Sequence, residues 1–145
     1  MTRSPIMDTI ADLVFHSAIV LSLYFLFAGH NQPGGGFVGG LVAAAAVVVY
    51  YVAGGMDEVR DLSRFRPWTI LGGGLVLASL AALVPLVAGD ALLQSDYVEG
   101  DLPVLGHVKL TSTLLFDSGV YAVVVGLVLM VFEGLGDEPE AEDHT

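Results

Sequence analysis

The chain has 145 residues and a formal charge of −11; 54% of its residues are hydrophobic, 14% are charged and none is cysteine. Soluble domains carry about 25% charged residues, so this composition excludes an ordinary soluble domain and indicates one integral membrane domain in a lipid bilayer. The missing cysteines exclude disulfides and thiolate metal sites, and the negative charge argues against nucleic acid, which needs a basic surface.

Charged residues are concentrated in four short stretches, separated by long apolar intervals. A membrane-spanning helix needs about 20 mostly apolar residues. We therefore predict an all-α integral membrane fold with four transmembrane helices, arranged as up-and-down hairpins within a domain over residues 1–133. The spans are expected at residues 6–28, 36–55, 68–89 and 110–132.

The first predicted span has acids in its opening turns, which the helix dipole favours and which we place at the membrane interface. Asp12 and His16 stand four residues apart, so they share one face of this helix. Histidine exchanges protons near neutral pH, which makes the pair a candidate for a proton path. The alternative is a histidine that only packs against its neighbours.

A glycine-rich turn, GHNQPGGGFVGG at residues 29–40, joins the first two predicted spans. It is neither a phosphate-binding loop nor a dinucleotide fingerprint, because no Gly-Lys-Ser/Thr follows it and no strand precedes it. Bare backbone cannot face lipid, so the turn is expected to pack against helices or beside water. Gly36, Gly40 and Ala44 continue as a small-residue stripe that lets another helix approach closely.

Two interpretations of this turn remain open. It is a tight hairpin with a packing seam, or it places His30 and Asn31 beside an ion or proton path. The predicted helix-packing motif consists of Pro33, Gly34, Gly35, Gly36, Phe37, Gly39 and Gly40.

Arginines indicate the orientation of the predicted spans. The side of the membrane that holds both termini and the loop at residues 56–67 carries Arg3, Arg60, Arg64 and Arg66. Basic residues favour the cytoplasmic side, so both termini are predicted to be cytoplasmic and the chain to reside in the cell membrane. Residues 134–145 are acidic and poor in large apolar residues, which predicts a disordered tail.

Asp117 is the only charged residue within residues 110–132. An acid inside a membrane is costly unless it faces protein or water, so it is a functional candidate. Lys109, Thr113 and Tyr121 lie at four-residue spacing on either side of it and predict one polar helix stripe. Asp117 serves either in a proton or sodium relay or as a buried acceptor that holds a partner helix.

The sequence carries no sign of an independent enzyme. No Ser-His-acid arrangement and no carboxylate pair set for hydrolysis stands out. The four histidines are scattered, whereas a metal site needs convergent ligands. We therefore expect no cofactor and no resident metal, only a transient Na+ near Asp117.

The sequence matches a family pattern at two places. GHNQPGGGFVGGL at residues 29–41 resembles the signature of the B subunit of Mrp-type multisubunit Na+/H+ antiporters. LPVLGHVKLTSTLLFDSGVYAVVVG at residues 102–126 resembles a second block of the same family, and its centre fits the family's FD-x-GVY pattern. The blocks stand in the family's order, and with the flanking spans the resemblance covers nearly the whole chain.

The resemblance implies a small, non-enzymatic subunit of a large membrane complex related to respiratory complex I. Its partners would then be the other subunits, including the large antiporter-like ones that carry most of the transport, with Na+ and H+ as the transported ions. This subunit would support assembly and the sodium path. An equivalent subunit of a membrane-bound hydrogenase or a related ferredoxin-driven complex is the alternative.

Family residues carry over only where the motifs match. They are His30, Asn31, Pro33, Gly34, Gly35, Gly36 and Phe37 from the first block, and Lys109, Phe116, Asp117, Gly119 and Tyr121 from the second. His107 departs from the pattern, because an acid is expected near that position in relatives, so a role of that carboxylate does not carry over.

Overall fold

The computed structural model describes residues 4–29, 34–54, 57, 59–60, 65–87, 97–102 and 106–136, with side chains described in 4–29, 34–54, 57, 59–60, 65–83 and 113–135. Four long helices and a β hairpin make up most of this part of the chain. The helices are α1 (Pro5–Ala28), α2 (Gly36–Gly54), α4 (Pro67–Val87) and α5 (Ser112–Gly136). The strands are β1 (Tyr97–Leu102) and β2 (Gly106–Thr111).

Prolines mark the start of two of these helices. Pro5 and Pro67 each occupy the first helical position, where the fixed φ of proline suits the helix and its missing N–H costs nothing. Ser4 precedes α1 in an extended conformation, and its carbonyl oxygen accepts a hydrogen bond from the Met7 amide at 2.9 Å. The start of α1 therefore follows from local chemistry alone.

The predicted helical membrane fold is confirmed, and the structure adds a β hairpin that the all-α prediction did not include. α1, α2 and the Thr113–Leu135 part of α5 are long and apolar enough to cross a membrane, by length and composition. The apolar stretch found in α4, Pro67–Leu83, is shorter, although the helix runs for 21 residues to Val87. At 1.5 Å per residue the whole helix measures about 31 Å, close to the thickness of the hydrocarbon core.

The last helix differs from the predicted span at both ends. Residues 106–111 form β2, which pairs with β1 in antiparallel register from Tyr97 opposite Thr111 to Leu102 opposite Gly106. Lys109 therefore lies in a strand, opposite Glu99, and the helical part of the polar stripe begins at Thr113. At the other end α5 continues to Gly136, inside the predicted tail, and residues 137–145 lie outside the described residues.

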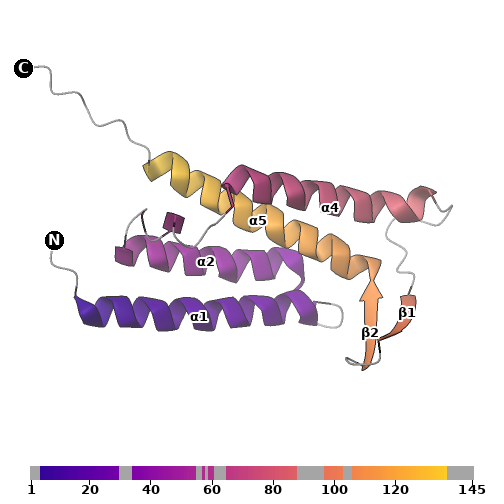
Figure 1. The fold of residues 1–145 in the computed structure, drawn as a ribbon, viewed down its shortest axis with the longest axis horizontal. Coiled ribbons are helices and arrows are strands. Elements are labelled where there is room, and N and C mark those ends of the chain that lie inside the picture. Colours follow the sequence, from indigo (N-terminus) through magenta and orange to yellow (C-terminus); the bar gives the residue numbers. More distant parts are fainter. Residues whose placement is uncertain are drawn as a thin grey trace, which may run out of the picture.

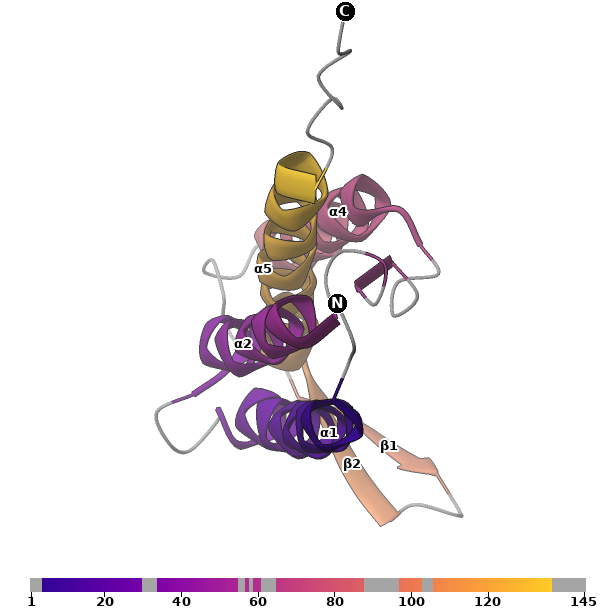
Figure 2. The ribbon, with the colours of Figure 1, turned by 90° about the vertical axis from the view of Figure 1, so that its left-hand side faces the viewer.

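The helices lie in the order α1, α2, α5, α4, each packed on the next (Figure 1). α5 is held between α2 and α4, whereas α1 packs along α2 and meets α5 at few residues. Seen from the end, α1 and α4 lie on opposite sides of the α2–α5 pair (Figure 2). α1 is therefore an edge helix of the bundle.

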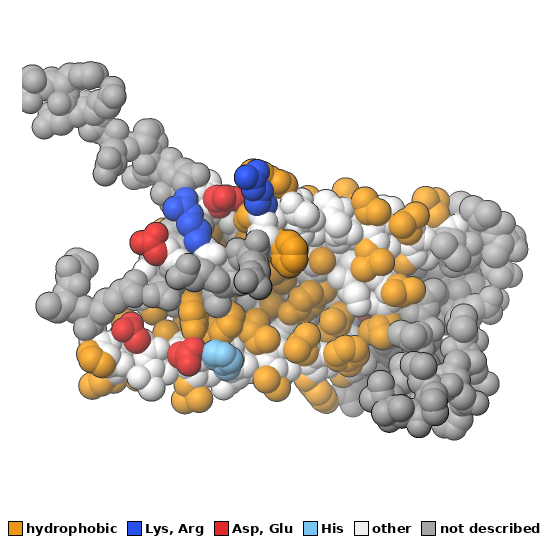
Figure 3. All heavy atoms as spheres, in the orientation of Figure 1, with side chains coloured by type: hydrophobic (Ala, Val, Ile, Leu, Met, Phe, Trp, Pro, Cys, Tyr) orange, Lys and Arg blue, Asp and Glu red, His pale blue; other side chains and the backbone are white. Residues whose placement is uncertain are grey.

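The two ends of the bundle differ in character. α1 begins and α5 ends at the same end, and the β hairpin lies at the other (Figure 1). Described charged side chains gather toward the first of these ends, while hydrophobic side chains cover the middle (Figure 3). The buried apolar cluster joins α2 to α5 through Val47 and Leu129, together with Val59. An apolar middle with a charged end is the surface expected of a bundle in a bilayer.

Glycines let α5 approach both of its neighbours closely. A Cβ at Gly119 would lie 2.6 Å from the Ala78 amide nitrogen of α4, and a Cβ at Gly74 would lie 2.7 Å from the Gly119 carbonyl oxygen. On the other side, a Cβ at Gly40 of α2 would lie 2.8 Å from the Val124 Cβ. Lipid is as apolar as leucine, so close van der Waals contact of this kind holds membrane helices together.

Candidate functional site

The glycine-rich turn and Asp117 are far apart in sequence but meet in the fold. Asp117 lies on α5 where this helix passes the start of α2. A Cβ at Gly35 would stand 3.1 Å from Oδ2 and 3.4 Å from Oδ1 of Asp117, so the carboxylate rests on this glycine. A Cβ at Gly36 would collide with the Asp117 carbonyl group. The two sequence motifs therefore form one site between α2 and α5.

Gly35 has the backbone conformation that closes the turn. Its φ is 89°, in the left-handed region that favours glycine. Its amide donates to the Phe25 carbonyl oxygen of α1 at 3.0 Å, and its carbonyl oxygen accepts from the Gly39 amide of α2 at 3.0 Å. Gly35 thus ties the two helices together while leaving space for the carboxylate.

The half-buried Asp117 carboxylate stands at the amino-terminal end of α2, beside the residue that precedes the helix. The first turn of a helix has unpaired N–H groups and the positive end of the helix dipole. An anion there gains roughly 0.3–1 kcal/mol, and more where it is partly buried. Among the side chains that the structure describes, no basic group pairs with Asp117. The carboxylate can therefore fix α2 against α5, receive a passing cation, or do both.

Tyr121 continues this site one helical turn further along α5. Its hydroxyl lies 2.8 Å from Oγ of Ser22 in α1, and Ser22 Oγ donates to the Gly39 carbonyl oxygen of α2, also at 2.8 Å. A carbonyl oxygen only accepts, so the single proton of Ser22 is committed to Gly39. Tyr121 must then donate to Ser22. One directed chain of hydrogen bonds links α5, α1 and α2.

Ser22 is the residue of this site that the sequence reasoning missed. It is fully buried, with 0% exposure, and sits in an apolar run of α1 where one serine gives no functional signal. Its position could have been found from helix periodicity. Ala11, Ser22 and Leu26 are the buried residues of α1, and the spacing of 11 and 4 places all three on one helix face.

The remaining residues predicted near Asp117 have mixed outcomes. Thr113 is half-buried one turn before Asp117, so it extends the polar column along α5. Phe37 is 58% exposed among the described residues. His30, Asn31, Pro33 and the side chain of Lys109 lie outside the described residues.

A second polar group lies on α1, around Asp12 and His16. The Tyr50 hydroxyl of α2 donates to Asp12 Oδ1 at 2.6 Å. His16 Nδ1 lies 2.8 Å from the Asp12 carbonyl oxygen and 3.3 Å from Asp12 Oδ1. Because the carbonyl oxygen only accepts, Nδ1 of His16 carries a proton, and in the neutral ring Nε2 is then an acceptor. Both side chains are exposed, 69% for His16 and 60% for Asp12.

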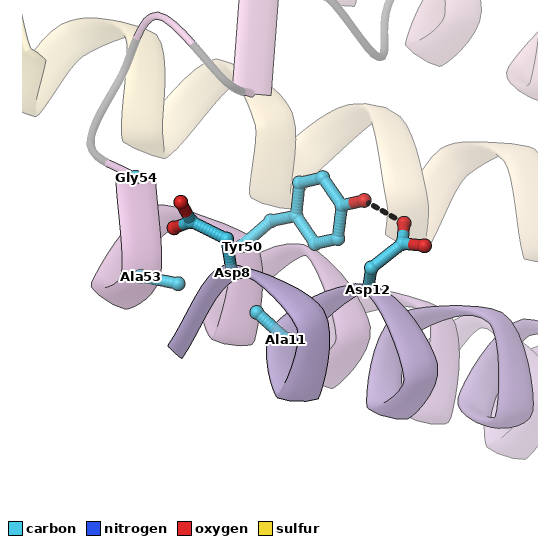
Figure 4. A pocket seen from close by; sticks show the side chains of 6 residues that line it. All are labelled: Asp8, Ala11, Asp12, Tyr50, Ala53 and Gly54. Atoms are coloured by element: carbon cyan, nitrogen blue, oxygen red, sulfur yellow. Dashed lines mark hydrogen bonds between the residues drawn. The ribbon is translucent and has the colours of Figure 1, made fainter. Parts of the chain in front are cut away.

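A pocket of about 240 Å³ opens beside this second group, between α1 and α2 (Figure 4). Asp8 and Asp12 stand on its α1 side, and the ring of Tyr50 lies between them (Figure 4). The complete lining is Asp8, Ala11, Asp12, Tyr50, Ala53 and Gly54.

The structure does not bring the two groups together. Asp12 lies near the start of α1 and Tyr50 near the end of α2, whereas Gly35 follows the end of α1 and precedes α2, so the groups occupy opposite ends of the α1–α2 pair. In the part of the chain that the structure describes, no three His, Asp or Glu side chains could hold a metal ion together. The sequence-predicted ion-path residues thus separate into two sites with different surroundings.

Comparison with known proteins places this fold in a family. Residues 6–130 match a family model described as a domain related to the MnhB subunit of Na+/H+ antiporter. The chain is 36% identical over 137 residues to the Na+/H+ antiporter B subunit of Bacillus subtilis (strain 168), covering 94% of this chain and 96% of that protein. It is 32% identical over 133 residues, 92% of each chain, to the Na+/H+ antiporter B subunit of Alkalihalophilus pseudofirmus (strain ATCC BAA-2126 / JCM 17055 / OF4). The chain therefore belongs to the family of domains related to the MnhB subunit of Na+/H+ antiporters.

Proposed function

We propose that this chain is a small subunit of a multisubunit Na+/H+ antiporter in the cell membrane and serves proton-driven sodium export. The family match over residues 6–130 supports this assignment, and so do three helices long and apolar enough to span a bilayer. The other subunits, including large antiporter-like ones, are its partners, and Na+ and H+ are the transported ions. The relatives described above are named for antiporters, which disfavours the hydrogenase-type alternative.

The contact between Asp117 and Gly35 is the observation that carries a role in the ion path. Ion sites in membrane transporters are commonly built where helices end, because helix termini and irregular backbone supply partial charges inside the membrane. Asp117 lies about 8 Å along α5 from Ser112, so it sits within the span and near one membrane surface. Thr113, Tyr121 and Ser22 extend the polar groups in both directions from it. We propose that these four side chains line one side of a sodium path. They are Thr113, Asp117 and Tyr121 of α5 and Ser22 of α1.

A scaffold role is the second candidate, and the glycine contacts favour it. Gly36 and Gly40 of α2 and Gly119 of α5 permit approaches that no other residue would allow. In this alternative Asp117 only secures α2 against α5. The scaffold role predicts that Gly40→Leu prevents complex formation, whereas Asp117→Asn leaves both assembly and transport intact.

Reconstitution of the complex with and without this subunit tests the assignment. Proteoliposomes that hold the complete complex are expected to show Na+-dependent proton movement, and those that lack only this chain are expected to lose it. Adding the chain back during purification should restore exchange, while the chain alone should exchange nothing. Full exchange by the complex without this subunit would contradict the assignment.

We also propose that α4 forms a fourth span and that both termini are cytoplasmic. α1 begins and α5 ends at the same end of the bundle (Figure 1), as an even number of spans requires. Arg60 and Arg66 lie in the segment between α2 and α4, and the two spans α1 and α2 return the chain to the side on which α1 begins. The positive-inside rule assigns that side to the cytoplasm.

A further inference from the structure

The outer face of α1 carries ionisable groups that lipid cannot solvate. α1 packs along α2 on one side, and only Ala11, Ser22 and Leu26 of this helix are buried. Its exposed residues include large apolar side chains from the first turn onward. Asp8, Asp12 and His16 are exposed among them, spaced one turn apart. We call this set the α1 polar stripe.

By helix length, the α1 polar stripe runs from the membrane interface, where α1 begins, into the hydrocarbon core. His16 lies 11 residues after Pro5, which is about 16 Å along a helix of about 36 Å, and Asp12 lies about 10 Å along it. A charged side chain that faces lipid at such depth costs several kcal/mol, so membrane helices turn these groups toward protein or water. Tyr50 of α2 bonds Asp12, yet among the described residues the side chains of Asp12 and His16 remain 60% and 69% exposed. Contact with another protein is one way to meet this requirement for groups so exposed.

With His16 in its neutral form, the unpaired atoms of Asp12 and His16 in the stripe are acceptors. Oδ2 of Asp12 has no hydrogen-bond partner among the described residues, and the Nδ1 proton of His16 is already committed to its own helix. Nε2 of neutral His16 is therefore an outward-facing acceptor. The described part of α1 holds two acids and no Lys or Arg. A partner that fits must supply donors and positive charge.

The pocket between α1 and α2 has room for a positively charged side chain of such a partner. Asp8 and Asp12 stand on one side of it, and Tyr50, Ala53 and Gly54 line the other (Figure 4). Its volume of about 240 Å³ accommodates the head of a long basic side chain. Arg and Lys bury their apolar stems in such places and pair their charged ends with carboxylates.

We propose that the α1 polar stripe docks against a transmembrane helix of another subunit, and that a Lys or Arg of that helix enters the pocket that Asp8 and Asp12 line. A second copy of this chain fits poorly, because it would bring four carboxylates to one interface with no basic residue of α1 between them. The inference rests on the proposed function only in that the chain works inside a multisubunit complex.

Photo-crosslinking in the assembled complex tests this proposal. A benzophenone amino acid replaces Val20, which is 69% exposed and one turn beyond His16, and is activated in native membranes. The expected product joins Val20 to a transmembrane segment of another subunit that holds a Lys or Arg within two turns of the linked residue. A product with phospholipid, with a second copy of this chain, or with a segment lacking Lys and Arg would overturn the proposal.

A second test of the proposal reverses the charge at Asp12 and then at the partner's basic residue. Asp12→Lys is expected to lower the yield of co-purified complex at least tenfold, and changing the crosslinked partner's basic residue to Asp is expected to restore most of that yield. Asp12→Asn, which keeps the shape and the Tyr50 bond, should give a smaller loss. Ser17→Ala is the matched control, because Ser17 bonds its own helix at the Leu13 carbonyl oxygen.

The outcomes separate this inference from the proposed function. Rescue by the reversed pair cannot arise from a misfolded chain. A complex that assembles with Asp12→Lys and exchanges Na+ normally would refute the docking surface and leave the proposed function standing. A wild-type complex without exchange would refute the proposed function.

Discussion

Ser22 and Tyr121 fix the direction of the hydrogen bonds at the junction of three helices. Ser22 satisfies the Gly39 carbonyl oxygen, and Tyr121 in turn donates to Ser22. Removing Ser22 leaves the Tyr121 hydroxyl without its acceptor and takes the second hydrogen bond from the Gly39 carbonyl oxygen, which keeps its bond within α2. Removing the Tyr121 hydroxyl leaves the Ser22–Gly39 bond intact. The two deletions should therefore differ in cost although they break the same contact.

Ser22→Ala is expected to destabilise the subunit by about 1–3 kcal/mol, the cost of unsatisfied buried polar groups. Tyr121→Phe is expected to cost less, about 0.6 kcal/mol, as is common for one hydrogen bond between membrane helices. Thermal unfolding of the complex in detergent measures both. Ser17→Ala controls for loss of a hydroxyl on the same helix. An equal or larger effect of Tyr121→Phe would contradict the assigned direction.

Gly36→Ala tests the contact between the turn and α5. The added Cβ would meet the Asp117 backbone carbonyl, which cannot rotate away as a side chain can. Overpacking of this kind costs about 1–3 kcal/mol, so we expect a lower thermal midpoint and a poorer yield of complex. Gly73→Ala is the control, because a Cβ at Gly73 has nothing within 4 Å in the described chain. Equal stability of the two variants would show that α2 does not approach Asp117 this closely.

At the scale of helices and strands, hydropathy and charge predict much of the structure and miss one part. The intervals without charge give four helices close to their observed positions, since a bilayer-spanning segment must satisfy its own backbone and remain apolar. The hairpin is not predicted, because Val108 and Leu110 continue the apolar run of the last span and strand pairing depends on a distant partner. For the same reason the four-residue spacing wrongly assigns Lys109 to a helix.

At the candidate site, too, some residues are predicted from the sequence and others are not. Asp117 stands out because it is a lone acid in an apolar run, and the glycine turn stands out by composition. Their contact depends on how α2 crosses α5, which one sequence does not encode locally. Ser22 carries no such signal in the sequence. It matters because its hydroxyl forms hydrogen bonds with both Gly39 and Tyr121 in the fold.

The seam between α4 and α5 gives a prediction at this scale. Gly74 and Gly119 face each other so closely that a Cβ on either would meet backbone of the other helix within 2.8 Å. Gly119→Leu is expected to separate α4 from α5 and abolish assembly, whereas Gly134→Leu, at an open position of α5 with nothing within 4 Å of its Cβ, should assemble normally. Co-purification of the other subunits measures the difference. Normal assembly of Gly119→Leu would contradict the packing.

At the scale of the whole molecule, the face drawn in Figure 3 is largely apolar over the described residues, and their charged side chains gather toward the end where α1 begins. A chain of net charge −11 can hold this arrangement because basic residues near the span ends decide orientation and acids contribute little. The large exposed residues of α1 and α4 then face lipid or other subunits. The α1 polar stripe is the region that we propose meets another subunit.

The absence of cysteine makes the orientation directly measurable. A single cysteine at Ser4, before α1, is expected to react with a membrane-impermeant maleimide only after cells are permeabilised. A single cysteine at Asp101, in β1 at the opposite end of the bundle, is expected to react in intact cells. The reverse pattern would invert the proposed topology, and labelling of both sites in intact cells would contradict an even number of spans.

The charge of Asp117 tests the account most directly. Exchange of Na+ for H+ is measured in vesicles that carry the intact complex with Asp117→Asn, beside Ser118→Ala, a neighbour whose hydroxyl bonds its own helix at the Leu114 carbonyl oxygen. The account predicts that Asp117→Asn assembles fully, since asparagine keeps the shape and an acceptor oxygen beside Gly35, but loses at least tenfold in exchange, while Ser118→Ala retains it. Assembly with normal exchange in Asp117→Asn would show that Asp117 is a packing residue and that the sodium path lies elsewhere.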